Sequence, residues 1–214
     1  MEGAIFDLDG TLLDSMPIWD TLAEDYLRKL GREPKEDLTE IFKTFSLEQS
    51  AEYYRKHYGV TLSASQIIED IQEMIKDFYQ NSVLLKNGCK EFLENLQQRG
   101  VKMCIATSCE RTLTEMALNR LGVRAYFSEI FTCTEHGCNK ESPKLYRIAL
   151  DHLGTEKEKT FVFEDAFHAL QTAKNDGFPT VAVYDKSEKE WEKMKAAATL
   201  YCLDFSSLKG VVIK

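Results

Sequence analysis

The sequence has 214 residues, a formal net charge of −8 and a hydrophobic share of 43%. This length fits one large globular domain or a domain with an insertion, and only 4 Pro beside 12 Phe and 9 Tyr exclude a disordered chain. Because the acidic chain has no basic cluster, no apolar run of roughly 20 residues and no signal peptide after Met1, we expect a cytoplasmic protein that binds neither nucleic acid nor membrane.

Five short apolar runs are predicted strands, and helical patterns separate most of them. The strands are expected at residues 4–6, 101–106, 130–133, 160–163 and 180–184. Near-continuous apolar runs are typical of parallel strands that are covered on both faces. Helices are expected at residues 89–99, 111–121, 142–153 and 165–176, the third with Ser142 as N-cap and Pro143 at its first position. This alternation predicts a doubly wound, Rossmann-like parallel α/β sheet.

One interval interrupts the alternation, because residues 15–80 contain helical patterns and no convincing strand. Apolar residues repeat with helical spacing in residues 18–30 and 67–78. Ser46 with Gln49, and Ser63 with Gln66, have the spacing of capping boxes. The sequence therefore predicts an α-helical domain of residues 15–82, inserted into an α/β core of residues 1–14 and 83–214.

The six cysteines are predicted to be reduced. Cys133 and Cys138 have four residues between them, as do Cys104 and Cys109, and this is not a common zinc spacing. His136 lies between the first two, so a metal cluster is the alternative. Free Cys in and near strands is commonly buried as a small apolar side chain.

The segment Asp7-Leu8-Asp9-Gly10-Thr11 follows the first predicted strand. In an open α/β sheet, ligands bind at the carboxyl ends of the strands. Side chains at positions i and i+2 of an extended chain share a face, so Asp7 and Asp9 can address one substrate group. An isolated pair of this kind is usually a solvated turn. Here the preceding residues are apolar and Gly10 permits a sharp exit, which favours a functional site.

Three further motifs follow in order. Thr107 ends the second predicted strand, Lys140 precedes a short helix, and the acidic pair Glu164-Asp165 follows a later strand. Together with the Asp7–Thr11 segment, these motifs resemble those of the haloacid dehalogenase superfamily. The resemblance covers essentially the whole chain. It points to the branch with a helical cap after the first strand, and within it to the β-phosphoglucomutase-like phosphatases.

The third motif departs from the family pattern K-P-x-P-D at two positions. Glu141 stands where Pro is usual, and Lys144 stands where Asp is usual. Two lysines therefore flank one helix start. Pro143 sets the register and favours Lys140 as the motif lysine, with Lys144 as the alternative.

The resemblance implies hydrolysis of a phosphomonoester through an aspartyl-phosphate. Asp7 would attack phosphorus, which divides one difficult displacement into two easier ones. Asp9 would protonate the leaving alcohol and then deprotonate the water. Thr107, the backbone N–H of Ser108 and Lys140 would hold the transferring phosphoryl oxygens. Because Asp9 is present, phosphoryl transfer is expected rather than dehalogenation.

The resemblance also implies a Mg²⁺ cofactor. A carboxylate and a phosphate dianion repel each other, by about 4 kcal/mol per unit-charge pair at 4 Å in an effective dielectric near 20. A hard cation with oxygen ligands offsets this repulsion. By resemblance its ligands are the Asp7 side chain, the Asp9 carbonyl and Asp165, with Glu164 in support directly or through water.

Within this branch, the alternative to a phosphatase is a β-phosphoglucomutase-like sugar phosphomutase. The mutases usually have a His shortly after the first motif and a Ser-Arg pair opening a cap helix, whereas this sequence has Trp19 and Ser46-Leu47 there. Residues 15–80 hold eight Lys and Arg against thirteen Asp and Glu, which suits a bisphosphate poorly. We therefore predict a phosphatase of small, sugar-phosphate-like metabolites, with Trp19 and Lys43 as candidate substrate contacts.

A non-catalytic phosphate-binding or signalling protein is the second alternative. A receiver domain is also doubly wound and phosphorylated on Asp, but it is shorter and lacks both a neighbouring acid and a helical cap. A non-catalytic protein of this kind would be expected to have lost a catalytic residue, and Asp7, Asp9, Thr107 and Lys140 are all present in this chain. We therefore expect an enzyme that acts on a small phosphorylated molecule as a monomer or weak dimer.

Overall fold

The computed structural model describes residues 1–42 and 45–208. The chain divides into two compact units, one formed by Met1–Asp14 with Val83–Lys214 and the other by Ser15–Ser82. None of the helices in the described ranges is both long enough and apolar enough to cross a lipid bilayer.

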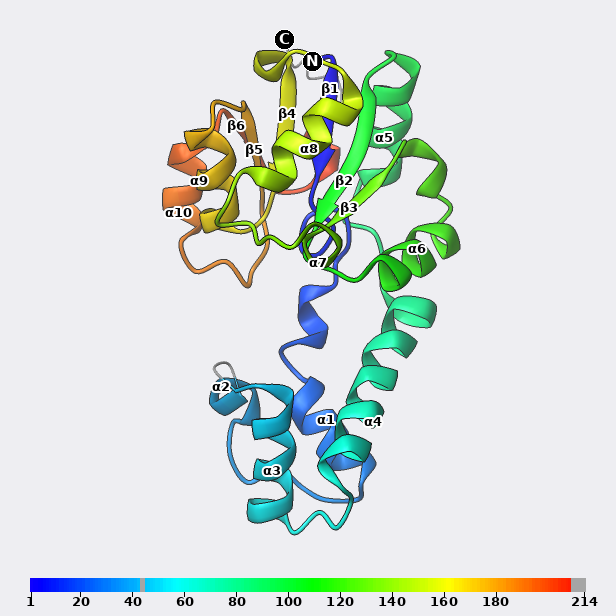
Figure 1. The fold of residues 1–214 in the computed structure, drawn as a ribbon, viewed down its shortest axis with the longest axis vertical. Helices are drawn as coiled ribbons and strands as arrows, with labels where there is room; N and C mark the ends of the chain where they lie inside the picture. Colours follow the sequence, from blue (N-terminus) through cyan, green and yellow to red (C-terminus); the bar gives the residue numbers. More distant parts are fainter. Residues whose placement is uncertain (43–44, 209–214) are drawn as a thin grey trace. The chain divides into compact units, whose positions relative to one another are not determined.

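The first unit is built on a parallel sheet with the strand order β3-β2-β1-β4-β5-β6 (Figure 1). The strands are β1 (Gly3–Phe6), β2 (Lys102–Thr107), β3 (Ile130–Thr132), β4 (Thr160–Glu164), β5 (Thr180–Val183) and β6 (Leu200–Cys202). β1 is central, and Ile5 lies opposite Cys104 of β2 and Val162 of β4. The chain runs outward from β1 to β3 and then crosses to β4, so the order reverses between β1 and β4. Ligands bind at such a switch point.

Helices cover both faces of this sheet (Figure 1). On one face, α8 (Lys144–Leu153) and α9 (Phe167–Asn175) enclose a core that includes Ile5 and Val162. On the other face, Phe92 of α5 (Cys89–Gln98) packs with its ring centroid 5.7 Å from that of Phe163. Neighbouring strand residues therefore face opposite layers, as a strand's period of two requires. The remaining helices of this unit are α6 (Arg111–Arg120), α7 (Cys133–His136) and α10 (Trp191–Ala197).

The doubly wound parallel fold confirms the sequence prediction, with local differences. β6 and α10 were not predicted. Pro143 is the N-cap of α8 rather than its first helical residue, and the Lys144 N–H donates to Ser142 Oγ at 3.3 Å. None of the six cysteines is in a disulfide, and the described residues form no metal-binding group that includes one.

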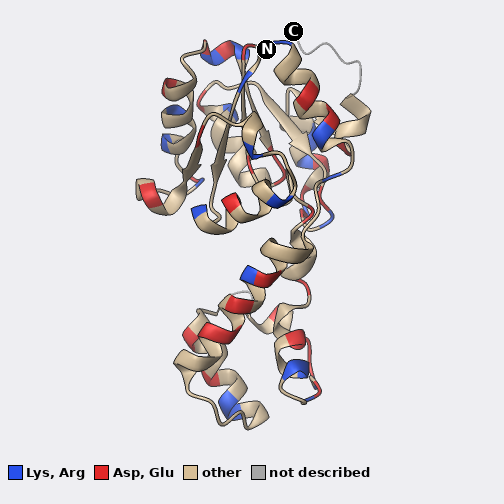
Figure 2. Cartoon of the chain, turned by 90° about the vertical axis from the view of Figure 1, so that its right-hand side faces the viewer, with Lys and Arg blue, Asp and Glu red and all other residues tan. Residues whose placement is uncertain are grey.

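The second unit is helical, with α1 (Leu22–Lys29), α2 (Leu38–Phe42), α3 (Leu47–Tyr58) and α4 (Ala64–Asp77). Its own core holds Tyr26, Tyr54 and Ile67 at full burial. Ser46 forms a complete capping box with Gln49. At α4, Ser63 Oγ accepts from the Gln66 N–H, but the Gln66 side chain donates to Asp70, so only half of the predicted box forms. Asp and Glu, drawn in red in Figure 2, are frequent along these helices.

Candidate active site

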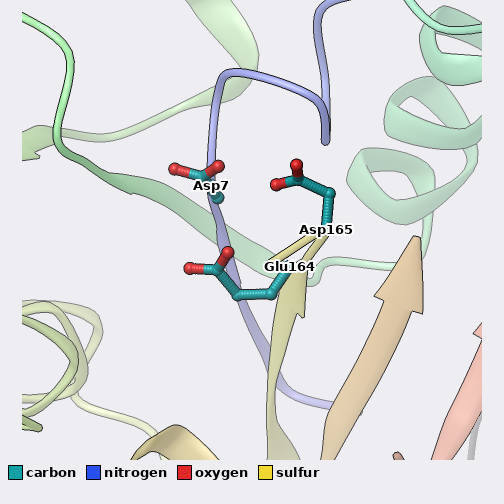
Figure 3. Close-up of side chains that lie close together, drawn as sticks. All are labelled: Asp7, Glu164 and Asp165. Carbon is teal, nitrogen blue, oxygen red and sulfur yellow. The ribbon is translucent and has the colours of Figure 1, made fainter. Parts of the chain in front are cut away.

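Three carboxyl groups meet at the carboxyl ends of β1 and β4. Asp7 directly follows β1, Glu164 ends β4, and Asp165 is the next residue. Ligand oxygens of the three lie within 4.8 Å of one another, and all three residues are buried. Figure 3 shows their carboxyl groups converging on one small volume. The backbone of Asp7 is fixed by its N–H, which donates to Phe163 O at 3.0 Å.

Lys140 is the cation of this group. Its Nζ donates to Asp7 Oδ1, and also to Glu164 Oε1 at 2.7 Å. Only 8% of the Lys140 side chain is exposed. Burial alone would lower the pKa of Lys140, but the charges of Asp7 and Glu164 outweigh burial and raise it above its ordinary value. Lys140 therefore carries its charge throughout the neutral range.

Glu164 is fully buried and uses its two oxygens differently. Oε1 accepts from Lys140 and, at 2.7 Å, from the hydroxyl of Tyr146 in α8. Oε2 is buried and has no hydrogen-bond partner among the described residues. Burial raises the pKa of Glu164 to about 7, although Lys140 opposes this shift.

The side chain of Asp165 is hydrogen-bonded to Thr11, a residue of the first motif. Thr11 Oγ1 donates to Asp165 Oδ1 at 3.0 Å, which connects residues 154 positions apart. Burial, together with the nearby charges of Asp7 and Glu164, raises the pKa of Asp165 well above its ordinary value. Three carboxyl groups therefore share one buried cation, Lys140, and the charged forms of Glu164 and Asp165 are disfavoured.

The arrangement fits a hard divalent cation. Three carboxyl groups with ligand oxygens this close together are the donor set that Mg²⁺ prefers. The unpartnered Oε2 of Glu164 is a buried acceptor suited to a metal ligand or to a water on the metal. A cation would also favour the charged forms of Glu164 and Asp165, whose pKa values burial has raised.

Asp9 lies in the tight loop that leaves β1. Leu12 N–H donates to Leu8 O at 2.9 Å, and Gly10 N–H donates to Leu13 O at 3.0 Å, which closes the loop. Gly10 has a φ of 73°, a left-handed conformation that a side chain would disfavour. The structure thus keeps Asp9 half-buried, two residues from Asp7.

The second motif lies at the end of the neighbouring strand. Thr107 is the last residue of β2, and its Oγ1 accepts from the Cys109 N–H at 3.0 Å. Ser108 is exposed beyond the strand end, with its Oγ 3.5 Å from Cys133 Sγ. In a parallel sheet these residues lie at the same edge as Asp7, because β1 and β2 are neighbours.

The other sequence-predicted positions lie elsewhere. Lys144 points away from the carboxyl groups, because its Nζ donates to His136 O at 2.7 Å. Trp19 belongs to the helical unit and is 43% exposed. Lys43 lies outside the described residues.

Two contacts of the site were not predicted. Thr11 was part of the first motif, but its partner 154 residues away was not evident. Tyr146 carries no sequence signal beyond its place in the first turn of α8.

The chain shares this architecture with a known family. The haloacid dehalogenase-like hydrolases match residues 4–183, a range that includes every residue of the site. The chain belongs to the haloacid dehalogenase-like hydrolases. This match confirms the family that the resemblance predicted.

Relatives within the family include phosphatases of different substrates. A phosphorylated carbohydrates phosphatase of Thermotoga maritima is 25% identical over 194 residues, which cover 85% of this chain and 84% of that protein. The validoxylamine A 7'-phosphate phosphatase of Streptomyces hygroscopicus is 27% identical over 195 residues, covering 87% of each chain. This chain is accordingly a phosphatase of the haloacid dehalogenase family.

Solved structures support the same fold. A Thermotoga maritima protein, assigned provisionally as a β-phosphoglucomutase, superposes with a TM-score of 0.86 at 23% identity, over 99% of this chain and 100% of that chain. At this level of identity the likeness shows the fold, which is the sheet of Figure 1 with a helical unit inserted after β1.

Proposed function

We propose that this phosphatase hydrolyses phosphomonoesters of small metabolites, in particular sugar phosphates, through an aspartyl-phosphate on Asp7. The observation that carries the proposal is the environment of Asp7. Its carboxylate lies at the end of the central strand, bonded to the buried ammonium of Lys140 and beside two further acids. The Thermotoga maritima relative named for phosphorylated carbohydrates supports the sugar-phosphate class.

In the first step a carboxylate oxygen of Asp7 attacks phosphorus, and the bond from phosphorus to the alcohol oxygen breaks. Asp9 gives its proton to that oxygen, so the alcohol leaves neutral. In the second step Asp9 takes a proton from water, and the resulting hydroxide attacks the phosphorus of the aspartyl-phosphate. Inorganic phosphate leaves, and Asp7 is restored as a carboxylate.

The neighbouring residues stabilise the transferring group. The Lys140 ammonium neutralises charge on Asp7 and on the phosphoryl oxygens, in a buried site where electrostatic interactions are strong. Thr107 and the backbone N–H of Ser108, at the end of β2, donate to the same oxygens. Their position on the neighbouring strand supports this role, because both strands end at one edge of the sheet.

The acidic group is proposed to hold Mg²⁺. Asp7, the carbonyl of Asp9 and Asp165 would be ligands, and Glu164 would bind directly or through water. When bound, the cation supplies positive charge against the repulsion between Asp7 and the phosphate dianion.

We further propose that Ser15–Ser82 is a cap that selects the substrate. Its eight Lys and Arg against thirteen Asp and Glu, counted over residues 15–80, favour a substrate with one phosphate over a bisphosphate. This charge supports hydrolysis over phosphomutase activity. Trp19, with an exposed indole, is the candidate contact for the leaving group.

The experiment compares Asp7→Asn and Asp9→Asn, with Asp14→Asn as a matched control on an exposed position. With Mg²⁺ and sugar phosphates, we expect Asp7→Asn to release no phosphate, because an amide is a poor nucleophile. Asp9→Asn should lose about 10²–10⁴-fold in rate, while the control should stay within about twofold.

Two results would contradict the proposal. The first is turnover by Asp7→Asn above a tenth of wild type. The second is conversion of β-glucose 1-phosphate to glucose 6-phosphate that outruns phosphate release when the 1,6-bisphosphate is present. The second result would identify a mutase instead.

A further inference from the structure

The short helix α7 ends in a turn that brings two cysteines together. Gly137 is its C-cap, in the left-handed conformation with a φ of 54°. The Cys138 N–H donates to Cys133 O at 3.1 Å, and the Gly137 N–H donates to Thr134 O at 3.3 Å. These two bonds define a Schellman cap, in which the residue after the glycine packs on the residue at the start of the last turn.

In this cap both of the packed residues are cysteines. Cys138 packs against the buried cluster that contains Cys133, and neither cysteine is in a disulfide. They line one open hollow with Gly137, Asn139 and Lys144. Cys138 is partly exposed and Cys133 is buried, so one thiol of the pair is accessible and the other lies behind it.

This pair is adjacent to two parts of the active site. Cys133 follows β3 directly, and its Sγ lies 3.5 Å from the hydroxyl of Ser108. Cys138 is two residues before Lys140, whose Nζ binds Asp7 and Glu164. Between the two cysteines, α7 is held on α6 by Arg111, whose Nε donates to Glu135 Oε1 at 2.6 Å. A change in the pair therefore reaches Ser108 through a side-chain contact and Lys140 through the chain.

We propose that Cys133 and Cys138 are a site of reversible disulfide formation, with hydrogen peroxide or a small disulfide as the oxidant. The cap already brings the two residues side by side, because the Cys138 N–H donates to Cys133 O and both residues line one hollow. Disulfide formation therefore needs rotation about side-chain bonds and little movement of the backbone.

With hydrogen peroxide, the accessible Cys138 sulfur attacks one peroxide oxygen. The O–O bond breaks, and Cys138 becomes a sulfenic acid while water is released. Cys133 sulfur then attacks the Cys138 sulfur, the S–O bond breaks, and a second water leaves. In sum, two thiols are oxidised to one disulfide and one peroxide is reduced to two waters. A thiol reductant returns both cysteines to the free form.

The disulfide is expected to slow the phosphatase, and this consequence rests on the proposed function. Cys133 Sγ would turn toward Cys138 and could no longer form its hydrogen bond with Ser108. The closed ring would also restrain the segment that carries Lys140. Because small displacements of groups that hold the reacting atoms are costly, we expect kcat to fall by about tenfold.

The cross-link is tested without any activity assay. Full-length protein is treated with hydrogen peroxide, the remaining thiols are blocked, and peptides are mapped by mass spectrometry. We expect loss of two hydrogen atoms and a peptide that joins Cys133 to Cys138. Cys138→Ser should abolish this product. The matched control Cys109→Ser removes another partly exposed thiol of the same edge and should retain it.

A second measurement probes the reduced pair directly. Phenylarsine oxide binds two adjacent thiols with release of one water, so it should label wild type and Cys109→Ser once at this pair, and Cys138→Ser not at all. Pairing of Cys133 with Cys109, or only intermolecular disulfides, would overturn the proposal.

Activity is then compared before oxidation, after oxidation and after reduction. Wild type should lose and regain kcat, whereas Cys138→Ser should keep its kcat throughout. A mapped Cys133–Cys138 disulfide with unchanged kcat would refute the link to activity. Absence of any phosphatase activity in the reduced protein would instead contradict the proposed function, and the mass measurement would still test the disulfide.

Discussion

At the scale of single residues, the charge balance of the site depends on Lys140. Its buried ammonium bonds both Asp7 and Glu164, whereas Lys144 lies on the surface with its Nζ on a backbone carbonyl. From the sequence, Lys140 and Lys144 were alternative candidates for the lysine of the third motif. Their surroundings differ because Lys144 is the first residue of α8, whereas Lys140 lies in the segment before this helix and reaches Glu164 at the end of β4.

This difference gives the first prediction. Lys140→Ala should lower kcat by about 10²–10³-fold, the cost of removing one group that stabilises developing charge. Lys144→Ala should stay within about twofold, because it removes only a surface contact. Steady-state kinetics with circular dichroism of both variants measures this. If Lys144→Ala were the more damaging change, Lys140 would not be the motif lysine.

Tyr146 gives the second prediction, because its hydroxyl binds the same Glu164 oxygen as Lys140. Burial raises the pKa of Tyr146 well above its ordinary value, so its hydroxyl remains a donor. Tyr146→Phe keeps the ring but frees Glu164 to turn. Mutation of a partner that orients a metal ligand typically weakens metal affinity by about 10–100-fold, and we expect a loss in this range for Mg²⁺.

The measurement is calorimetric titration of Mg²⁺ into the variant. Tyr126→Phe is the matched control, because the Tyr126 hydroxyl donates to Glu94 at 3.2 Å away from the site. Both variants should lose about 1 kcal/mol of stability at most. Equal Mg²⁺ affinity of Tyr146→Phe and wild type would show that Tyr146 does not orient Glu164.

At the scale of elements, apolar runs predicted the buried strands and missed the edge. β1 has four buried residues, and such runs are recognised from composition alone. β6 has three residues, of which Tyr201 is 50% exposed, so its apolar run is too short to predict a strand. It forms because β5 offers a free edge, where Ala182 pairs with Tyr201. The pairing that makes β6 a strand therefore depends on β5 and cannot be predicted from the residues of β6 alone.

The candidate site was predictable to the same extent. The resemblance of the motifs predicted that Asp7, Lys140 and Glu164 belong to one site, and the structure brings these side chains together. The bonds from Thr11 to Asp165 and from Tyr146 to Glu164 depend on the register of β1 with β4 and on the direction of α8. Neither the register nor the direction of α8 can be predicted from the spacing of residues along the chain.

Gly88 gives an element-scale prediction. It is the N-cap of α5, with a φ of 72°, and a Cβ there would lie 2.4 Å from Ser206 N. Gly88→Ala combines a left-handed backbone with a clash against main chain, so we expect a loss of about 3 kcal/mol. Gly100→Ala is the control, because Gly100 has a φ of 73° with no atom within 4 Å of its Cβ.

Urea unfolding of both glycine variants measures the difference. Gly100→Ala should lose only about 1 kcal/mol, from the left-handed conformation alone. A loss equal to that of Gly88→Ala would mean that contact with Ser206 contributes nothing.

At the scale of the whole molecule, the helical unit Ser15–Ser82 is an insertion between two segments that form one α/β unit. The outgoing and returning segments pair where the chain leaves the core. Asp14 N–H donates to Leu84 O, and Lys86 N–H donates to Leu12 O, both at 2.9 Å. Each unit has its own buried cluster among the described residues.

One ion pair connects the segment that follows the helical unit to the end of β5. Lys86 Nζ lies 2.5 Å from Asp185 Oδ2, just after β5, and the Asp185 side chain is 2% exposed. Burial raises the pKa of Asp185, but the hydrogen bonds from Lys86 and Ser187 outweigh burial and lower it below its ordinary value. An acid whose pKa is lowered by folding stabilises the fold above its unfolded pKa. That stabilisation is lost as pH falls through the folded pKa.

Lys86→Met should therefore lower stability in a pH-dependent way. At pH 7 the variant leaves Asp185 charged and buried without its partner, which costs about 3 kcal/mol. Near pH 3 Asp185 of the variant is protonated and neutral, while wild type has begun to lose its ion pair, so the two should converge. Lys159→Met is the control, because Lys159 pairs with Glu2 on the surface with both side chains 48% exposed. It should cost less than about 1 kcal/mol at either pH. Chemical unfolding at pH 7 and at pH 3 measures the difference in free energy of unfolding between Lys86→Met and wild type. If this difference were the same at both pH values, Asp185 would not depend on Lys86 for its charge.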